Sequence, residues 1–214
     1  NITLFTEDAN YYKEKKEFNL LGGVMMVEES DTLICESMIH FGTEEPYLKA
    51  IGNVDFQQEK HKVTCDSLFY WTEKDSSSAF GNVHMIQINR ELNSEKFDFW
   101  KTIGYRGSSF IASGNCILED ESKIIQASKI FYDDDNQLMT LKDNCSVEEP
   151  NRGLSGNEIF IQYADSLIQY LSVYGDAAAY NDLHAKVTES TVDKQQFRDD
   201  MSSINMYTNF NPDN

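Results

Sequence analysis

The chain has 214 residues, with 36 acidic against 18 basic side chains and a formal net charge of −18 at pH 7. This acidity argues against a nucleic-acid-binding class, which needs a basic footprint, and against flat docking on an anionic membrane. Apolar residues make up 40% of the chain, enough for a packed core, yet no window approaches the run of about 18 apolar residues that a membrane-spanning helix needs.

The clearest pattern is an internal repeat, which predicts a stack of similar structural units. A Gly-Asn-Val motif occurs at residues 52–54 and 81–83, and related motifs precede and follow these two copies. The residue in the valine position recurs in steps of 29 to 33 residues. Its six occurrences are Val24, Val54, Val83, Cys116, Cys145 and Ala177.

The first element of each unit is predicted to be a strand that follows a tight turn. After residue 53, Val54 and Phe56 alternate with Asp55 and Gln57, which is the period of a half-buried strand. The Gly-Asn pair at residues 52–53 suits a turn that needs positive φ. We therefore expect this strand to begin at the valine position.

A second motif lies about ten residues further along each unit and predicts a second strand. Val63 and Cys65 are in phase with Leu68 only after a shift of one residue, so we expect a β-bulge at Asp66 or Ser67. Copies occur at residues 8–12, 33–41, 63–71, 94–100, 125–132 and 154–161, and residues 187–197 form a weaker last copy.

These elements predict one all-β domain over residues 1–214, an elongated sandwich or twisted β-jelly roll of roughly a dozen short strands. The repeat is clearest over residues 8–163 and degenerate over 164–214. Because the repeat starts half a unit early and the sequence ends at residues 211–214, we expect that the chain is a fragment of a longer one. No basic-then-apolar leader is present, so we expect any export signal to lie outside this sequence.

The alternation also predicts which side chains face inward. That set comprises Val24, Met26, Leu33, Met38, Val54, Phe56, Val63, Leu68, Tyr70, Val83, Met85, Phe97, Phe99, Ile125, Ile130 and Tyr132.

A Gly-Asn-Val strand followed by the motif at residues 63–70, Val-Thr-Cys-Asp-Ser-Leu-Phe-Tyr, resembles the OstA-like repeat of the LptA-like lipopolysaccharide-transport family. The resemblance implies a twisted β-jelly roll, open along one side, with an apolar groove that shields the acyl chains of lipopolysaccharide. It implies neither catalytic residues nor a cofactor. The groove residues expected on this basis are Val24, Met26, Met38, Val54, Phe56, Leu68, Tyr70, Val83, Met85, Phe97, Phe99, Ile130 and Tyr132.

The resemblance also implies a location and partners. We expect a periplasmic protein, associated with the outer membrane, that binds lipopolysaccharide or another acyl-chain lipid. Its partners would be other β-jelly-roll proteins of an export bridge, which pair through edge strands, and further copies of itself stacked head to tail.

Two other classes of function fit the same residues. A closed, dry core with the same inward set would make the chain a non-catalytic scaffold that assembles through exposed edge strands. A carbohydrate-active enzyme would instead need a pair of carboxylates in a cleft, and the many acidic loops allow such a pair by chance.

The cysteines and histidines give no separate chemistry. Because the four cysteines occupy small apolar positions of the repeat, buried free thiols are one interpretation, and the disulfides Cys35–Cys65 and Cys116–Cys145 are the other. The acidic run at residues 133–136 is typical of a hairpin turn. His40, His61, His84 and His184 lack the paired spacing of metal ligands, so no metal site is predicted.

Overall fold

A computed structural model describes residues 2–42, 45–58, 61–71, 73–101, 108–164, 167–183 and 197–209. His184, the chain end at 211–214 and nearly all of the weak copy at 187–197 lie outside these ranges. Within the described part of the chain, no helix is long and apolar enough to span a membrane.

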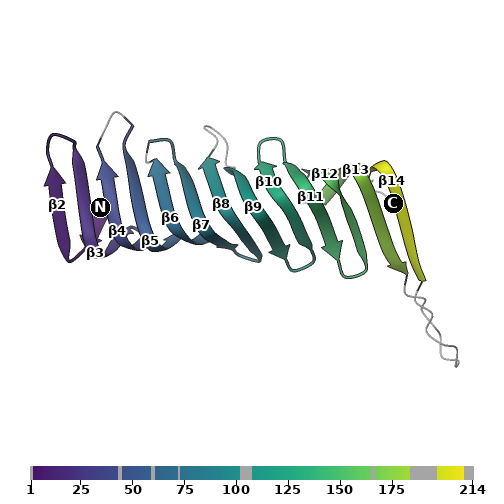
Figure 1. Cartoon of the computed structure of the whole chain (residues 1–214), viewed down its shortest axis with the longest axis horizontal. Helices are drawn as coiled ribbons and strands as arrows, with labels where there is room; N and C mark the ends of the chain where they lie inside the picture. The colour runs from purple at the N-terminus through teal and green to yellow at the C-terminus, as the bar shows by residue number, and fades with distance from the viewer. Residues whose placement is uncertain are drawn as a thin grey trace, which may run out of the picture.

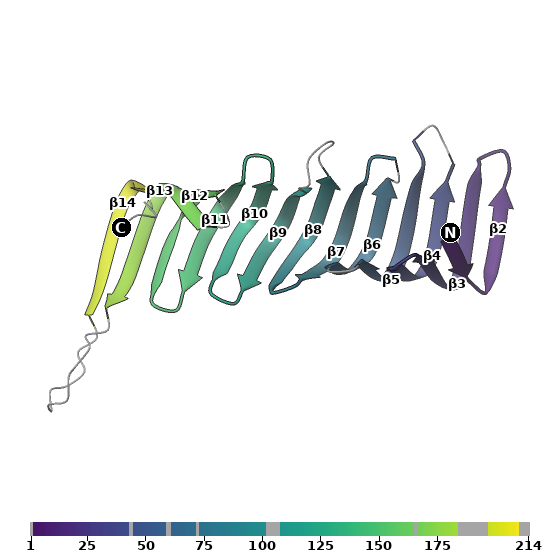
Figure 2. The same ribbon diagram turned by 180° about the vertical axis from the view of Figure 1, so that it is seen from behind.

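The described residues form one antiparallel sheet in which β3 to β14 follow one another in chain order, while β1 and β2 both pair with β3 (Figures 1 and 2). The strands are β1 (Ile2–Phe5), β2 (Asp8–Tyr12), β3 (Glu17–Glu28), β4 (Asp31–Phe41), β5 (Tyr47–Gln58), β6 (His61–Trp71), β7 (Ser76–Gln87), β8 (Arg90–Lys101), β9 (Ser108–Asp120), β10 (Ile124–Asp133), β11 (Leu138–Glu149), β12 (Arg152–Ala164), β13 (Leu167–Leu183) and β14 (Phe197–Asn209). This confirms the predicted all-β, repeat-based fold.

Each Gly-Asn motif lies in the middle of a strand and bends it, so the prediction that strands begin at the valine position is wrong. In β5, Gly52 and Asn53 have φ of 80° and 46°, and strand pairing resumes at Val54. Left-handed residues kink a strand without ending its pairing, and the sequence signal for such a kink is the same as for a turn. The strands are therefore longer than predicted.

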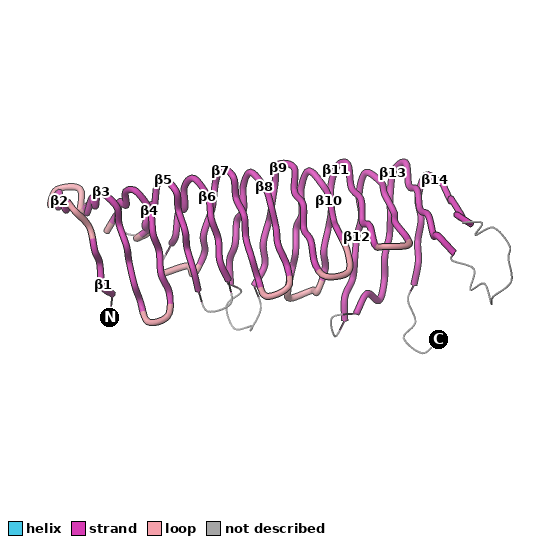
Figure 3. Tube along the Cα trace, turned by 90° about the horizontal axis from the view of Figure 1, so that it is seen from below, coloured by secondary structure: helices cyan, strands magenta, loops and turns pink. Residues whose placement is uncertain are grey.

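The predicted bulge is found at Asp66. Ile51 pairs with Ser67 and Val54 pairs with Cys65, so the two residues of the Gly-Asn motif face Asp66 alone. The same two-against-one pattern recurs along the sheet, which folds over a row of corners. Figure 3 shows the strands passing over this ridge, with most of the connecting turns on the opposite side.

Side-chain hydrogen bonds join the corners of neighbouring strands in pairs. Asn53 Nδ2 donates to Glu36 Oε1 at 2.7 Å and Asn82 Nδ2 donates to Asp66 Oδ2 at 3.0 Å. Farther along, Asn115 Nδ2 donates to Glu95 Oε1 at 3.1 Å. Each acidic residue thus receives an amide proton from the following strand, which fixes the corner at the same height in successive strands.

The corners divide the sheet into two arms. Arm A comprises the strand halves that lead to the turns near residues 13–16, 73–75 and 134–137. Arm B comprises the halves that lead to the turns at 29–30, 88–89, 121–122 and 150–151. The valine positions lie just inside the corner, and all six are buried, at 1–2% exposure. The core is therefore the space between the arms.

The cysteines are free, buried thiols at these corners, and neither of the two alternative disulfides is formed. Cys65 Sγ donates to the carbonyl oxygen of Ser67 at 3.3 Å, across the bulge. Ser94, in the equivalent position of β8, donates to the carbonyl of Lys96 at 3.1 Å. Burial raises the pKa of each thiol to about 11, so these side chains stay protonated donors at neutral pH.

Two features require glycine at a corner position such as Gly81, namely the positive φ and the close approach of a side chain from the neighbouring strand. A Cβ on Gly81, where φ is 73°, would collide with the Asp66 carboxylate, whereas a Cβ on Gly23, where φ is 81°, would meet nothing within 4 Å. We predict that Gly23→Ala lowers the free energy of unfolding by about 1 kcal/mol, the cost of the left-handed backbone. Gly81→Ala should lower it by about 2–3 kcal/mol. Urea unfolding measures both, and equal losses would contradict the corner geometry.

Candidate functional site

The interior between the arms is a continuous apolar strip that runs the length of the sheet. The strands β3 to β13 contribute buried residues on both sides of their corners, and equivalent positions recur from unit to unit. At the centre of this strip Leu92, Ile125, Leu141 and Ile159 are 0% exposed. Equivalent apolar positions therefore follow one another along the long axis of the molecule.

Most of the predicted groove residues lie in this strip. Those that are buried are Val24, Met38, Val54, Leu68, Val83, Met85, Phe97 and Ile130. Met26, Phe56, Phe99 and Tyr132 are partly buried and pack against the core, and the Tyr70 ring lies 6.5 Å from the Phe56 ring. The structure places these side chains on the inner faces of the two arms.

Two of the predicted residues belong to the rim rather than to the floor of the groove. The Tyr70 hydroxyl donates to Asp75 Oδ1 at 3.3 Å, and the Tyr132 hydroxyl donates to Asp134 Oδ1 at 3.0 Å. Burial, together with these carboxylates, raises the pKa of both tyrosines to about 12. Both hydroxyls therefore remain neutral donors at the edge of arm A.

The sequence interpretation missed part of the inner surface, in the first strand of each unit. Because strands were expected to begin at the valine position, the halves that precede the corner were left out. The buried residues missed there include Leu20, Leu48, Ala50, Ala79, Ala112, Met139, Leu141, Leu171 and Val173. Their alternation with outward residues, as in Leu48-Lys49-Ala50, carried the signal.

A second aromatic row lies on the outer face of arm A and was also missed. The Tyr47 ring stacks on Phe41 with centroids 4.5 Å apart, and Phe69 meets Phe80 edge-on at 5.7 Å. Lys49 Nζ lies 5.1 Å from the centre of the Phe69 ring. These side chains cover the outside of the sheet, so the aromatic content of the chain does not belong to the groove alone.

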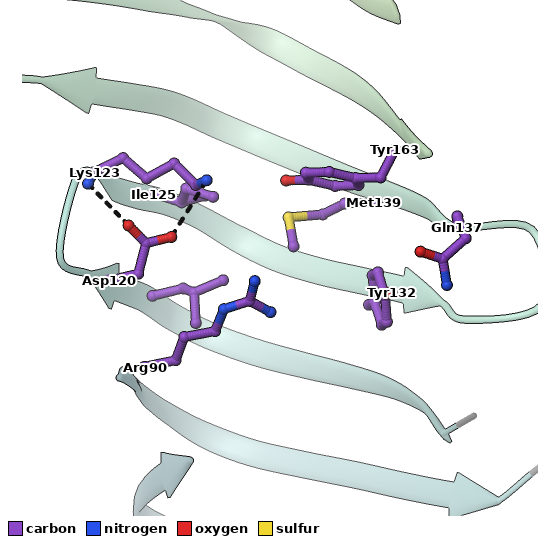
Figure 4. A pocket seen from close by; sticks show the side chains of 9 residues that line it. Arg90, Asp120, Lys123, Ile125, Tyr132, Gln137, Met139 and Tyr163 are labelled. Carbon is purple, nitrogen blue, oxygen red and sulfur yellow. Dashed lines mark hydrogen bonds and ion pairs between the residues drawn. The ribbon is translucent and has the colours of Figure 1, made fainter. Parts of the chain in front are cut away.

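The mouth between the arms contains a cavity of about 110 Å³ (Figure 4). Its floor is formed by Leu118, Ile125 and Met139, which are buried. Its rim carries the polar side chains of both arms, namely Arg90, Asp120, Lys123, Tyr132, Gln137 and Tyr163. Along the described part of the strip, the buried side chains of the two arms pack into one hydrophobic core cluster.

The described residues offer no metal centre, since no three His, Cys, Asp or Glu side chains converge on one point there. The acidic run at 133–136 forms a turn, in which Asp133 Oδ1 accepts a hydrogen bond from the backbone N–H of Asp135 at 3.1 Å. The site that the fold does provide is an apolar interior with a polar mouth, which is typical of a protein that shields apolar groups from water.

Comparison with protein families gives one match to this chain. Residues 62–166 match the family described as "LptA/(LptD N-terminal domain) LPS transport protein". This match confirms the predicted resemblance to the OstA-like and LptA-like family, and residues 62–166 are the part of the chain that is similar to it.

Solved structures give a more distant likeness. One is LptH, the LptA-homologous periplasmic component of the lipopolysaccharide transport device from Pseudomonas aeruginosa, which aligns with a TM-score of 0.46 and 13% sequence identity. The alignment covers 64% of this chain and 92% of that one, and a likeness at this level does not bear on function. Among curated proteins, none matches the sequence.

Proposed function

We propose that this chain is a periplasmic lipid-carrying domain that holds the acyl chains of lipopolysaccharide between its two arms, as part of an export bridge to the outer membrane. The observation that carries the proposal is the buried apolar strip, repeated unit by unit along the sheet. The family match over residues 62–166 supports lipopolysaccharide as the cargo.

The physical need for such a strip follows from the cost of exposing acyl chains to water. Each exposed CH₂ group costs about 0.8 kcal/mol, so a chain of about 12 carbons costs on the order of 10 kcal/mol. An apolar interior removes most of that cost. Because each unit presents the same positions, a lipid that moves by one unit finds a similar environment and meets no deep trap.

The arms must separate for a lipid to enter, because side chains already fill the interior. The ion pairs Lys62–Asp55, at 2.8 Å, and Lys142–Glu158, at 3.1 Å, each lie within one arm. The rim hydrogen bond from Tyr132 to Asp134 also lies within one arm. Contact between the arms is mainly apolar packing, so an inserted acyl chain replaces one apolar neighbour with another.

A matched pair of phenylalanines tests the proposal directly. Phe56 is partly buried against the core, while Phe69 is equally aromatic and half-buried but packs with the outer row. We predict that the photo-crosslinker p-benzoylphenylalanine at position 56 couples to lipopolysaccharide on irradiation and that the same group at position 69 does not. Mass spectrometry of the adducts identifies the coupled lipid.

A plain phospholipid serves as the competitor, and circular dichroism confirms that both substituted proteins are folded. Coupling at position 69 but not at 56 would place the lipid on the outer face and overturn the proposal. Absence of coupling at both positions would leave the scaffold as the better function.

Assembly through an edge strand is the second part of the proposed function. β1 and β2 pair with β3 on one side only, and they expose Ile2 at 57%, Phe5 at 58% and Tyr11 at 60%. An apolar edge with free backbone groups is a template for strand addition. We propose that it pairs with another β-jelly-roll protein of the bridge or with a second copy, head to tail.

The edge proposal predicts concentration-dependent growth of the particle mass in light scattering. Replacing both Phe5 and Tyr11 by Lys should abolish this growth, because charges on an edge strand oppose pairing. Ile88→Lys is the control, since Ile88 is 69% exposed but lies in a turn away from the edge. A strictly monomeric wild-type chain at high concentration would contradict head-to-tail assembly. It would leave the lipid proposal unaffected, because the coupling at position 56 tests that separately.

A further inference from the structure

A row of basic residues lies along the turns of arm B. His61, Arg90 and Arg152 each begin the second strand of a hairpin, and Lys123 takes the same place just before β10. In a chain of net charge −18, such a row is a part of the surface where an anion meets several basic side chains.

Acidic partners neutralise two members of this row. Lys123 Nζ lies 3.2 Å from Asp120 Oδ2, and Arg152 pairs with Glu149 across its own hairpin. At Arg90 the hairpin partner is Gln87, which carries no charge. An acidic residue of the same hairpin therefore neutralises the charge of Lys123 and of Arg152, but none does so for Arg90.

The neighbouring strand β9 does not supply an acidic partner for Arg90 either. Asp120 lies opposite Arg90 in β9, but its carboxylate is held on its own turn by the backbone N–H groups of Ser122, at 2.9 Å, and Lys123, at 3.1 Å. Within the described ranges Arg90 makes no ion pair and no side-chain hydrogen bond. Figure 4 shows its guanidinium pointing into the cavity at the mouth of the arms.

The cavity beneath Arg90 is amphipathic. Its floor is Leu118, Ile125 and Met139, which belong to the same core that fills the space between the arms. Burial raises the pKa of Tyr163, on the opposite rim, to about 12, so this tyrosine adds no negative charge at neutral pH. A cationic group thus stands above an entrance to the apolar interior.

From this geometry we propose that the mouth at Arg90 is a head-group subsite for an anionic amphiphile, which places a phosphate on the guanidinium and its acyl chain against Leu118, Ile125 and Met139. The planar fork of arginine matches two phosphate oxygens at once. This inference rests on the proposed function, because the bound chain would enter the same interior. The positions along the apolar strip are otherwise equivalent. The subsite at Arg90 would give one of them a preference for anionic lipids over neutral ones.

The test is a titration followed by amide chemical shifts, with dodecyl phosphate below its micelle concentration as the probe. We expect shifts around residues 90, 118–125 and 132–139, and binding about tenfold weaker in Arg90→Gln, since one charge-assisted contact is lost. Arg152→Gln is the matched control and should bind as the wild type does, because Arg152 does not line the cavity. Neutral dodecyl maltoside should bind both variants alike.

Equal affinity of the wild type and Arg90→Gln for dodecyl phosphate would overturn the subsite. So would inorganic phosphate that binds at Arg90 as tightly as dodecyl phosphate does, because the site would then take a free anion. These failures are distinct from failure of the proposed function, which the coupling at position 56 reports without reference to Arg90. Preserved dispersion of the amide spectrum shows that each variant is folded.

Discussion

The corner in the middle of each strand is the constraint on which the rest of the structure depends. A flat antiparallel sheet of this length would leave one apolar face in water, and folding it over a line of kinks buries that face against itself. The kink needs two successive left-handed residues, as at Gly81 and Asn82, with φ of 73° and 47°. It also needs a carboxylate on the preceding strand to receive the asparagine amide, as Asp66 does. Where the later units lose the asparagine–acid pair, the valine position is still buried, as at Cys145 and Ala177, so the fold tolerates a partial corner.

Much of this was predictable from the sequence, because every unit repeats the same alternation. The valine positions, the bulge at Asp66 and the inward direction of Phe97 or Ile130 follow from periodicity alone. The role of the Gly-Asn pair did not, because positive φ marks a turn and a kink alike, and only pairing with the next strand tells them apart. The cavity at Arg90 was equally out of reach, since it combines residues from β8, β9, β10, β11 and β12 that meet only when the two arms close.

Because side chains pack the interior, a bound lipid must displace contacts between the two arms. A permanently open groove would bind lipid without a structural cost, whereas these arms exchange their own packing for the lipid's. The free energy lost when the arms part is nearly balanced by the free energy gained when they pack on an acyl chain, because the hydrophobic effect is proportional to the apolar area buried and is non-directional. The corners provide a natural line about which the arms could separate, and the polar ties at the rim, such as Tyr132 to Asp134, stay within one arm. A scaffold needs no such exchange, so separation of the arms is the property that divides the two functions.

Separation can be measured as a distance across the mouth. Glu73 in arm A and Ile88 in arm B lie near the two ends of β7, and both are exposed, so spin labels on cysteines placed there report the opening. The native thiols are buried and protonated, and they leave the labelling specific. The account predicts that lipopolysaccharide lengthens the distance between positions 73 and 88 by several ångström and leaves a control pair within arm A, 73 and 135, unchanged. Bound lipopolysaccharide with an unchanged distance across the mouth would contradict it.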